Sequence, residues 1–483
     1  MRCRSLFVAL CAALLSPLGN AAPPSLATAL ELQGLPLHVA PQPLIDKALA
    51  QSQAKPQPLR IAVAIPMSLS LRDGLWDEPN PGLSRWRSQV SSHGAKFLAL
   101  TFSDFALPAA AELWLYDAHG GLMQGPYTAA SRNTEGMLWT ALVPTDTVVI
   151  ELQVPTANLA AVQLQLTRID HGIRPFDKAG VTGGNAGSCN IDAACSQGNS
   201  HRDQIRSVAV YTIDDGSGML VCTGQLVNNM RQDATPYFLS AHHCGARNNA
   251  GSMVLYWNFQ RSSCGSGTGS MSQTQSGAVF RAGDSRSDFA LVQLNQRPLS
   301  AFNVFYTGWD VTSTPPQSGA AIHHPAGDVK KVSLYTAAAT PSDGVLIAGR
   351  PTDAWEVHWS QGTTEGGSSG AGLYNQNRQI VGVLSGGDAS CSNRNGPDYF
   401  GRLSNAWQAS AARNGQLKAW LDPDNTGRTT LCGQNPGAPC APDLISMPDP
   451  SAAGGAPGLW LLAALGMVGL FSAARACRVS ARA

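Results

Sequence analysis

The octet "EGGSSGAG", from Glu365 to Gly372, is the stretch of sequence on which the fold and function of this chain depend. Its glycines suit either a flexible spacer or a tight catalytic loop, and nothing inside the octet decides between them. A serine is a poor nucleophile unless a base takes its proton, and that base works best when a carboxylate orients it. A catalytic role therefore requires a histidine and an acid elsewhere in the chain.

The sequence before the octet supplies both groups. His243 lies in "FLSAHHC" directly after a predicted strand, and Asp288 in "SRSDFALVQL" opens another. Together with Ser369 they give the order His, Asp, Ser. A bridge between Cys222 and Cys244 would pin the histidine loop to the preceding strand. Glycines on both sides of the serines allow the tight backbone that turns amide N–H groups toward a developing oxyanion.

Composition narrows the class of protein. The chain has 483 residues, enough for two or three domains, and its charged residues are 13% of the total with a formal net charge of +1. A nucleic-acid binder would show a basic surplus, so that class is disfavoured. With 49 Gly and 31 Pro between short apolar runs, strands and turns are expected in preference to long helices.

Residues 1–21 have the pattern of a signal peptide: arginines at the start, an apolar centre, and small residues before a cut after Ala21. Cys11 raises lipidation as an alternative, but Leu10 stands where that site needs a small residue. Export places the later cysteines in an oxidising compartment, where disulfides are the default. A zinc site is the alternative, but no CxxC pair occurs. The exported set is Cys189, Cys195, Cys222, Cys244, Cys264, Cys391, Cys432 and Cys440.

Two strand-rich units follow the signal peptide. Residues 22–178 contain no cysteine, and segments such as "RIAVAIPMSLSL" and "TVVIELQVP" alternate apolar and polar residues, which predicts a small antiparallel β-sandwich. Residues 179–427 are again strand-rich, and "LSNAWQASAARNGQLKAWL" predicts one helix near their end. The expected fold class of this second unit is all-β with a C-terminal helix.

The remainder of the chain is predicted to be a linker and a membrane segment. Residues 428–453 are rich in Pro, Gly and Ala, with a small loop closed by Cys432 and Cys440. Residues 454–483 hold an uncharged apolar run followed by arginines, which predicts a span with a cytoplasmic tail; a buried core helix is the alternative.

The His-Asp-Ser trio resembles that of the trypsin-like double β-barrel serine proteases. The segments "GSCNIDAAC", "YFLSAHHCG", "AIHHP", "TTEGGSSGAGLY" and "PDYFGRL" are similar to the bacterial lysyl endopeptidase branch, over essentially all of residues 187–427. The resemblance implies that His243 is the general base, Asp288 its orienting acid and Ser369 the nucleophile, with the N–H groups of Gly367 and Ser369 as the oxyanion hole. It also implies the disulfides Cys189–Cys391, Cys195–Cys264 and Cys222–Cys244. Cys432 and Cys440 fall outside the family pattern, and their pairing is a separate inference.

Specificity for a basic side chain requires a buried carboxylate in the primary pocket. Six residues before the nucleophile, where trypsin-like enzymes of this specificity have an aspartate, the chain has Thr363. The resemblance makes Asp398 in "PDYFGRL" the pocket anion, with a turn aspartate as the alternative. Before the pocket glycines Gly386 and Gly387 stands Ser385, where the family has a histidine. Its stacking tryptophan is also replaced, by Leu346 or Ile347, so lysine alone and lysine plus arginine both remain open.

Activation is expected to differ from that of trypsin. Ser368 stands where trypsin has the aspartate that pairs with a freed N-terminus, so the N-terminal segment is instead tethered by Cys189. The first unit resembles the family's pro-region, and self-cleavage is predicted between Lys178 and Ala179. Gly454 and Gly455 resemble glycine-glycine C-terminal sorting signals.

These features predict a secreted or cell-surface serine endopeptidase that cleaves after lysine. The alternatives are a catalytically silent binding protein of the same fold and a serine protease of different specificity. No cofactor or metal is expected, because neither His242 with His243 nor His323 with His324 has a further ligand at recognisable spacing. The expected partners are protein or peptide substrates, the export and sorting machinery and, transiently, a membrane; nucleic acid is not expected, and the protein is predicted to be a monomer. His358, Trp355 and Trp359 are interpreted as strand residues.

Overall fold

The structure is a computed structural model that describes residues 29–52, 58–118, 121–176, 186–438 and 440. None of the helices in these ranges has the length and apolar character that a bilayer crossing requires. The predicted signal peptide, the Lys178–Ala179 junction and the C-terminal segment 454–483 lie outside the described residues.

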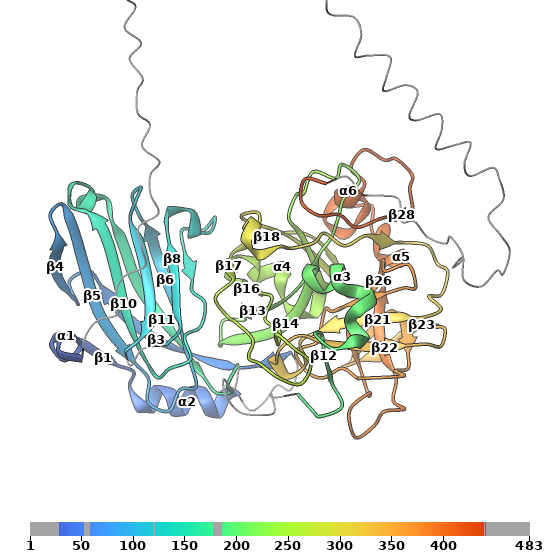
Figure 1. The fold of residues 1–483 in the computed structure, drawn as a ribbon, viewed down its shortest axis with the longest axis horizontal. Coiled ribbons are helices and arrows are strands. Elements are labelled where there is room, and N and C mark those ends of the chain that lie inside the picture. The colour runs from blue at the N-terminus through green and yellow to red at the C-terminus, as the bar shows by residue number, and fades with distance from the viewer. Residues whose placement is uncertain (1–28, 53–57, 119–120, 177–185, 439, 441–483) are drawn as a thin grey trace, which may run out of the picture. The chain divides into compact units, whose positions relative to one another are not determined.

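Residues 29–176 form a β-sandwich, as the alternating pattern predicts. One sheet has the order β1-β5-β10-β7-β8, and β4 also pairs with β5. The other sheet has the order β3-β11-β6-β9. Apart from the parallel pair of β1 with β5, the pairings are antiparallel, and the two sheets enclose one apolar core. The blue and cyan strands in Figure 1 are these two layers.

The strands of this unit are β1 (Leu37–Val39), β3 (Ala62–Ser70), β4 (Leu75–Asn80), β5 (Leu83–Ser91), β6 (Leu98–Ala106), β7 (Glu112–Asp117), β8 (Met123–Tyr127), β9 (Leu138–Trp139), β10 (Thr147–Pro155) and β11 (Gln163–Gly172). Its helical elements are α1 (Ala29–Gly34), α2 (Gln42–Ser52), η1 (Ala129–Ser131) and η2 (Thr156–Ala161).

The second unit is built on two further sheets, so the all-β prediction is confirmed for the described residues. The first sheet has the order β17-β16-β13-β14-β15-β19-β18 and surrounds its own apolar cluster. The second runs β12-β22-β21-β25-β26-β27-β24-β23, with β20 paired to β26 and β28 paired to β20. A third apolar cluster packs between residues of both sheets, which fixes one against the other.

The first of these sheets contains β13 (Val208–Asp214), β14 (Met219–Leu226), β15 (Tyr237–Ala241), β16 (Val254–Trp257), β17 (Thr274–Ser276), β18 (Ala278–Asp284) and β19 (Phe289–Leu294). The second contains β12 (Ile191–Asp192), β20 (Trp309–Asp310), β21 (Gly319–His323), β22 (Lys331–Tyr335), β23 (Thr340–Ile347), β24 (Arg350–Val357), β25 (Gly372–Tyr374), β26 (Ile380–Gly387), β27 (Asp398–Arg402) and β28 (Thr430–Leu431). The short helical elements are η3 (Ser196–His201), α3 (Arg202–Ser207), η4 (His242–Cys244), α4 (Ala246–Asn249), η5 (Ala250–Ser252), η6 (Ser300–Phe302) and η7 (Pro325–Gly327).

Two predictions about the end of this unit are wrong in detail. The single C-terminal helix is instead three short pieces, α5 (Leu403–Trp407), η8 (Arg413–Gly415) and α6 (Lys418–Leu421). The stretch "QASAARNG" between α5 and α6 contains Ser, Asn and Gly, which compete poorly for helix interiors.

The second wrong prediction is the linker at residues 428–453, because the described part of this stretch contains a strand. Strand β28 pairs with β20, Leu431 is buried, and the backbone of Gln434 exchanges hydrogen bonds with Tyr306. The described part of this stretch is therefore packed into the second unit, and composition alone hides a strand of two residues.

The two units share a sheet and a core. Strand β2 (Leu59–Arg60), which lies between α2 and β3 in the chain, pairs with β14 as an extra antiparallel strand. Phe176, at the end of the sandwich unit, packs on Tyr256 and Phe259 with ring centroids 5.1 and 5.5 Å away. The apolar cluster around these rings draws residues from both units, so residues 29–176 are an integral part of the packing of this chain.

Candidate active site

His243 and Asp288 lie together at the ends of two paired strands. Strand β15 ends at Ala241, β19 begins at Phe289, and these two residues are register partners. Nδ1 of His243 is 2.8 Å from Oδ2 of Asp288, and the backbone N–H of His243 donates to Oδ1 at 3.0 Å. One carboxylate oxygen therefore holds the imidazole and the other holds the backbone of the same residue, which leaves Nε2 on the opposite side of the ring.

Asp288 is kept ionised in a buried position. Burial alone would raise its pKa, but the His243 imidazole, the His243 N–H and the nearby Ser385 hydroxyl hold the pKa below the ordinary value of 3.8. The Asp288 backbone has φ of 49°, a left-handed conformation that is costly for a residue other than glycine. Such a conformation marks a position where side-chain direction outweighs local strain.

Ser369 is fastened to the same corner of the molecule. Cys222 in β14 forms a disulfide with Cys244, the residue after His243, and the Cys244 sulfur lies 3.9 Å from the Ser369 carbonyl oxygen. The N–H of Thr223 donates to that carbonyl at 2.8 Å. The serine, the histidine and the bridge thus meet at one point on β14.

The link between serine and histidine is open in this structure. The His243 side chain is 3% exposed, and its Nε2 makes no hydrogen bond to a described residue. Catalytic hydrogen bonds are often long before substrate binds. The missing bond between Ser369 and His243 is therefore compatible with a catalytic role for both residues.

The carbonyl oxygens of the loop from Glu365 to Ser369 are all occupied. The donors are Ser368 N–H to Glu365 O at 3.0 Å, Ala326 N–H to Gly366 O at 2.6 Å, the Thr223 hydroxyl to Gly367 O at 2.9 Å, Ala371 N–H to Ser368 O at 2.9 Å and Thr223 N–H to Ser369 O at 2.8 Å.

This occupation fixes where the N–H groups of the loop point. In a trans peptide the N–H points opposite to the carbonyl of the same unit, so holding the Gly366 and Ser368 carbonyls aims the N–H groups of Gly367 and Ser369 away from those donors. Neither N–H donates to another described residue. Gly367 has φ of 98°, and a Cβ there would lie 2.9 Å from backbone atoms of His324 and Gly327. Two preset donors with no described acceptor are what an oxyanion requires.

Asp398 is a buried carboxylate behind two glycines. It opens β27, is 1% exposed, and its Oδ2 accepts hydrogen bonds from Trp359 Nε1 at 2.6 Å and from the Thr364 hydroxyl at 2.8 Å. Burial raises its pKa to about 6, against the opposing effect of those two donors. A carboxylate kept in this setting without a cation carries a desolvation cost that a bound cation would relieve.

Gly387 lies directly against the Asp398 carboxylate. The glycine is exposed, it faces Asp398 across the β26–β27 pair, and a Cβ on it would lie 2.2 Å from Oδ1 of the aspartate. Gly386, with φ of 146°, lies against Ile347, where a Cβ would come within 2.9 Å of the isoleucine methyl. Ile347 thus lies beside the first pocket glycine, whereas Leu346 is exposed.

The other two predicted pocket residues have different surroundings. Thr363 is fully buried, and its carbonyl accepts a hydrogen bond from Ser333 at 2.7 Å. Ser385 is fully buried beside Asp288, where its hydroxyl lowers the pKa of that carboxyl without a hydrogen bond of ordinary geometry. Ser385 therefore contacts the acid of the His-Asp pair.

Sequence reasoning missed the two donors to Asp398. The prediction that Trp359 is a strand residue is wrong, because β24 ends at Val357, and nothing in the sequence distinguishes Thr364 from its neighbour Thr363. Trp359 was recognisable only as one of two tryptophans in "WEVHWS", and its partner lies 39 positions further along the chain.

The four expected disulfides are present: Cys189–Cys391, Cys195–Cys264, Cys222–Cys244 and Cys432–Cys440. The first bridge holds the start of the second unit next to the serine loop. There the Glu365 carboxylate accepts the Gly187 N–H at 2.9 Å and the Asn190 amide at 2.8 Å. Hydrogen bonds thus connect the first described residues of this unit to Glu365, at the start of the serine loop.

The histidine pair at positions 323 and 324 is engaged in other contacts than metal binding. His323 bonds to Ser368 and Ser333, and His324 bonds to the Asp328 carbonyl. Within the described residues no group of three or more His, Cys, Asp and Glu is arranged to hold a metal ion.

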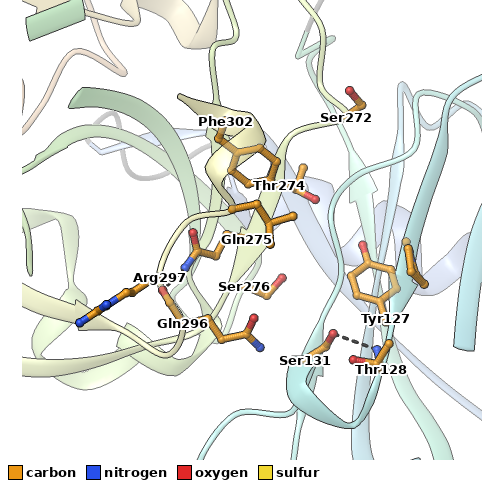
Figure 2. A pocket seen from close by; sticks show the side chains of 13 residues that line it. Tyr127, Thr128, Ser131, Ser272, Thr274, Gln275, Ser276, Gln296, Arg297 and Phe302 are labelled. Carbon is orange, nitrogen blue, oxygen red and sulfur yellow. Dashed lines mark hydrogen bonds between the residues drawn. The ribbon is translucent and has the colours of Figure 1, made fainter. Parts of the chain in front are cut away.

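A separate cavity of about 320 Å³ lies between the two units, away from the residues above. Figure 2 shows Tyr127, Thr128 and Ser131 facing Thr274, Gln275 and Gln296 across it. Its lining is neutral except for Arg297, which donates to the Asp233 carbonyl. The cavity offers no group that could act as a nucleophile or general base with an oriented partner.

Two comparisons with known proteins agree with each other. Residues 183–401 match the family described as "Lysyl endopeptidase, C-terminal domain". The lysyl endopeptidase of Pseudomonas aeruginosa is 28% identical over 407 residues, which cover 78% of this chain and 86% of the relative. The chain is thus similar to the lysyl endopeptidases over much of its length.

The match to the Pseudomonas lysyl endopeptidase extends well beyond residues 183–401, so part of it lies outside the protease unit. These two matches support a serine endopeptidase. Solved structures with a partial likeness include the active form of the Rv3671c protease from Mycobacterium tuberculosis, with 16% identity, 47% of this chain, 89% of that chain and a TM-score of 0.33. The protease Anisep from Arthrobacter nicotinovorans has 14% identity, 44% and 93% coverage and a TM-score of 0.33.

Proposed function

We propose that the protein is an exported serine endopeptidase that hydrolyses peptide bonds on the carboxyl side of lysine. The observation that carries the specificity is Asp398, a buried carboxylate with a raised pKa that lies directly against the exposed Gly387. A lysine ammonium in front of Gly387 would pair with this charge, for which the described residues supply hydrogen-bond donors but no cationic partner.

The catalytic sequence follows from the contacts of three residues. His243 accepts the proton of the Ser369 hydroxyl through Nε2 while its Nδ1–H stays on Asp288, and the serine oxygen attacks the scissile carbonyl. The N–H groups of Gly367 and Ser369 stabilise the resulting oxyanion. The imidazolium then protonates the leaving amine, and a water activated by the same histidine releases the acyl group from Ser369.

Lysine is favoured over arginine by the hydrogen bonds already made at Asp398. Oδ2 accepts two donors, from Trp359 and Thr364, so its lone pairs are occupied. A bidentate arginine needs both carboxylate oxygens, whereas a lysine ammonium needs one. Some cleavage after arginine remains the expected consequence of the missing tryptophan-histidine stack.

Digestion of an unstructured peptide mixture, followed by mass spectrometry of the products, tests this function. Cuts after lysine support the proposal, and cuts after lysine and arginine identify a relaxed pocket. Asp398→Asn should lower kcat/KM for lysine peptides by at least about a hundredfold, on the loss of a desolvated charge pair. Cuts after residues without positive charge would refute the pocket, and a chain without hydrolysis of any peptide would be a silent binding protein.

We further propose that residues 22–178 are a pro-region that blocks the cleft until it is removed. Strand β2 supports this, because it pairs with Leu220 and Val221 of β14 and its Leu59 lies within van der Waals reach of Gly366, three residues before the nucleophile. Extended peptides bind proteases by such strand addition, so β2 occupies an edge on which substrate residues beyond the scissile bond would lie. Cleavage after Lys178 would fit the proposed specificity.

Self-processing is tested by comparing wild type with Ser369→Ala. Wild type should yield a protein that begins at Ala179, and Ser369→Ala should remain intact. A precursor of Ser369→Ala that is cleaved in a purified preparation would contradict self-processing.

Export by residues 1–21 and removal or retention of residues 454–483 at a membrane are part of the same proposal. Mass spectrometry of the protein recovered from the medium, the membrane fraction and the cell would locate both ends. A monomer is expected, and sedimentation velocity measures it.

A further inference from the structure

A buried chain of hydrogen bonds lies behind the serine loop. His323 is 0% exposed at the end of β21, where its Nδ1 is 2.8 Å from the Ser368 hydroxyl and its Nε2 is 3.0 Å from the Ser333 hydroxyl. Ser333 lies 2.7 Å from the Thr363 carbonyl, and Ser368 lies 3.2 Å from the Glu365 N–H. Ser368 is the residue between the two proposed oxyanion donors.

The direction of every proton in this chain can be deduced. The Thr363 carbonyl can only accept, so the Ser333 hydroxyl donates to it and must itself accept from Nε2–H of His323. A neutral imidazole then has a bare Nδ1, which accepts from the Ser368 hydroxyl. The Ser368 oxygen, having donated its proton, accepts the Glu365 N–H.

The neutral form of His323 is favoured by its surroundings. Burial lowers the pKa of His323 to about 3, and the charge of Lys331 acts in the same direction. Both ring nitrogens of His323 contact serine hydroxyls, which are uncharged. The tautomer with the proton on Nε2 therefore persists over the pH range in which a protease works.

The loop that follows His323 makes a second contact with the same segment. Ala326, in η7, donates its N–H to the Gly366 carbonyl at 2.6 Å, and the peptide N–H of His324 donates to the Thr223 hydroxyl that holds Gly367. Loop 323–327 thus contacts the Gly366 carbonyl directly and the Gly367 carbonyl through Thr223, in addition to the Ser368 side chain.

We propose that His323 is a positioning residue that presets the oxyanion loop through Ser368, so that the loop needs no inserted N-terminal ammonium to adopt its active form. The inference rests on the proposed peptidase function, because the loop it positions is the proposed oxyanion hole. Ser368 then has a role of its own. Its hydrogen bond to the neutral Nδ1 of His323 takes the place of the charge pair that an aspartate at this position would form with an N-terminal ammonium.

Two substitutions of His323 separate positioning from simple packing. In His323→Asn the amide oxygen can occupy the place of Nδ1 and still accept from Ser368. In His323→Gln the amide nitrogen can occupy the place of Nε2 and still donate to Ser333, but the acceptor for Ser368 is lost. Both variants are polar and smaller than histidine, so they differ mainly in which end of the chain survives.

The expected result is an order of activity. With a lysine peptide amide as substrate, kcat of His323→Asn should stay within about threefold of wild type. For His323→Gln and Ser368→Ala it should fall about tenfold or more, with KM changed less than about twofold, as the loss of one oriented hydrogen bond implies. Affinity for a peptide aldehyde that forms a tetrahedral adduct should fall in parallel with kcat.

Ser207→Ala is the matched control, because Ser207 is a fully buried serine whose hydroxyl donates to the Gln204 carbonyl at 2.7 Å and contacts Tyr374. It should lower thermal stability without lowering kcat. Equal activities of the Asn and Gln variants, or a better Gln variant, would overturn the positioning role. A wild type that hydrolyses no substrate would overturn the proposed function and this inference together, which is a different result.

Discussion

Replacing Asp398 with asparagine should stabilise the protein at alkaline pH while it removes lysine cleavage. The folded state raises the pKa of Asp398 from 3.8 to about 6, so the folded protein binds this proton more tightly than the unfolded chain. The contribution of this raised pKa to the free energy of unfolding is fully present below pH 3.8. It is lost as the pH rises through about 6 and is absent above that value. At about 1.4 kcal/mol per pH unit the loss amounts to roughly 3 kcal/mol.

Asparagine removes this loss because it carries no charge. Its amide oxygen can keep the hydrogen bonds from Trp359 and Thr364, but its NH₂ group would face the Ala389 N–H that now bonds to the carboxylate. That mismatch costs about 1–2 kcal/mol at every pH. The variant should therefore be less stable than wild type at pH 4 and about 1–2 kcal/mol more stable at pH 8.

Urea unfolding at several pH values measures this difference. Both proteins should carry Ser369→Ala, so that self-digestion does not contribute, and Asp46→Asn on α2 controls for the removal of an exposed carboxylate. The change of the difference between pH 4 and pH 8 is the decisive quantity, because the fixed hydrogen-bond cost cancels in it. A difference that stays constant within about 0.5 kcal/mol would refute the assignment of a buried, destabilising charge to Asp398.

Three further outcomes are expected. The KM for lysine peptides should rise as pH falls through about 6, because protonated Asp398 no longer attracts the ammonium; KM measured from pH 5 to 8 checks this, and a flat KM would contradict it. Gly387→Ala should lower kcat/KM for lysine peptides at least about tenfold with unchanged hydrolysis of an ester that lacks a basic side chain, since the added methyl meets the Asp398 carboxylate. Arg60→Ala removes the half-buried pair with Asp215 at 2.5 Å and should weaken inhibition by the cleaved pro-region about threefold to thirtyfold in a titration of activity, whereas an unchanged inhibition constant would argue against β2 as the blocking strand.

The triad candidates can be recognised in the sequence because short motifs carry them, and the structure confirms the four disulfides, three of which the family resemblance implies. His243 is identified by the cysteine after it, and Ser369 by the glycines around it, without knowledge of their distance in space. Asp398 is found only through resemblance to a family, since a Pro-Asp pair is otherwise typical of a turn.

The residues that support these groups were beyond sequence reasoning. Thr223 and Trp359 act through partners far along the chain, so their roles depend on how the strands pair. His323 is one of two adjacent histidines, and only the β21–β22 register shows that Ser333 lies within its reach. The broken C-terminal helix and strand β28 likewise result from packing that outweighs local composition.

If residues 22–178 are the proposed pro-region, the pairing of β2 with β14 would make inhibition depend on protein concentration. While residues 59–60 and β14 belong to one covalent chain, their local concentration is fixed by the chain itself and does not depend on how much protein is present. Once the junction is cut, the same contacts join two separate molecules, and their occupancy falls as the protein is diluted. The cleaved protein would then stay silent where it is crowded and become active as it spreads into a larger volume, with no further chemical step.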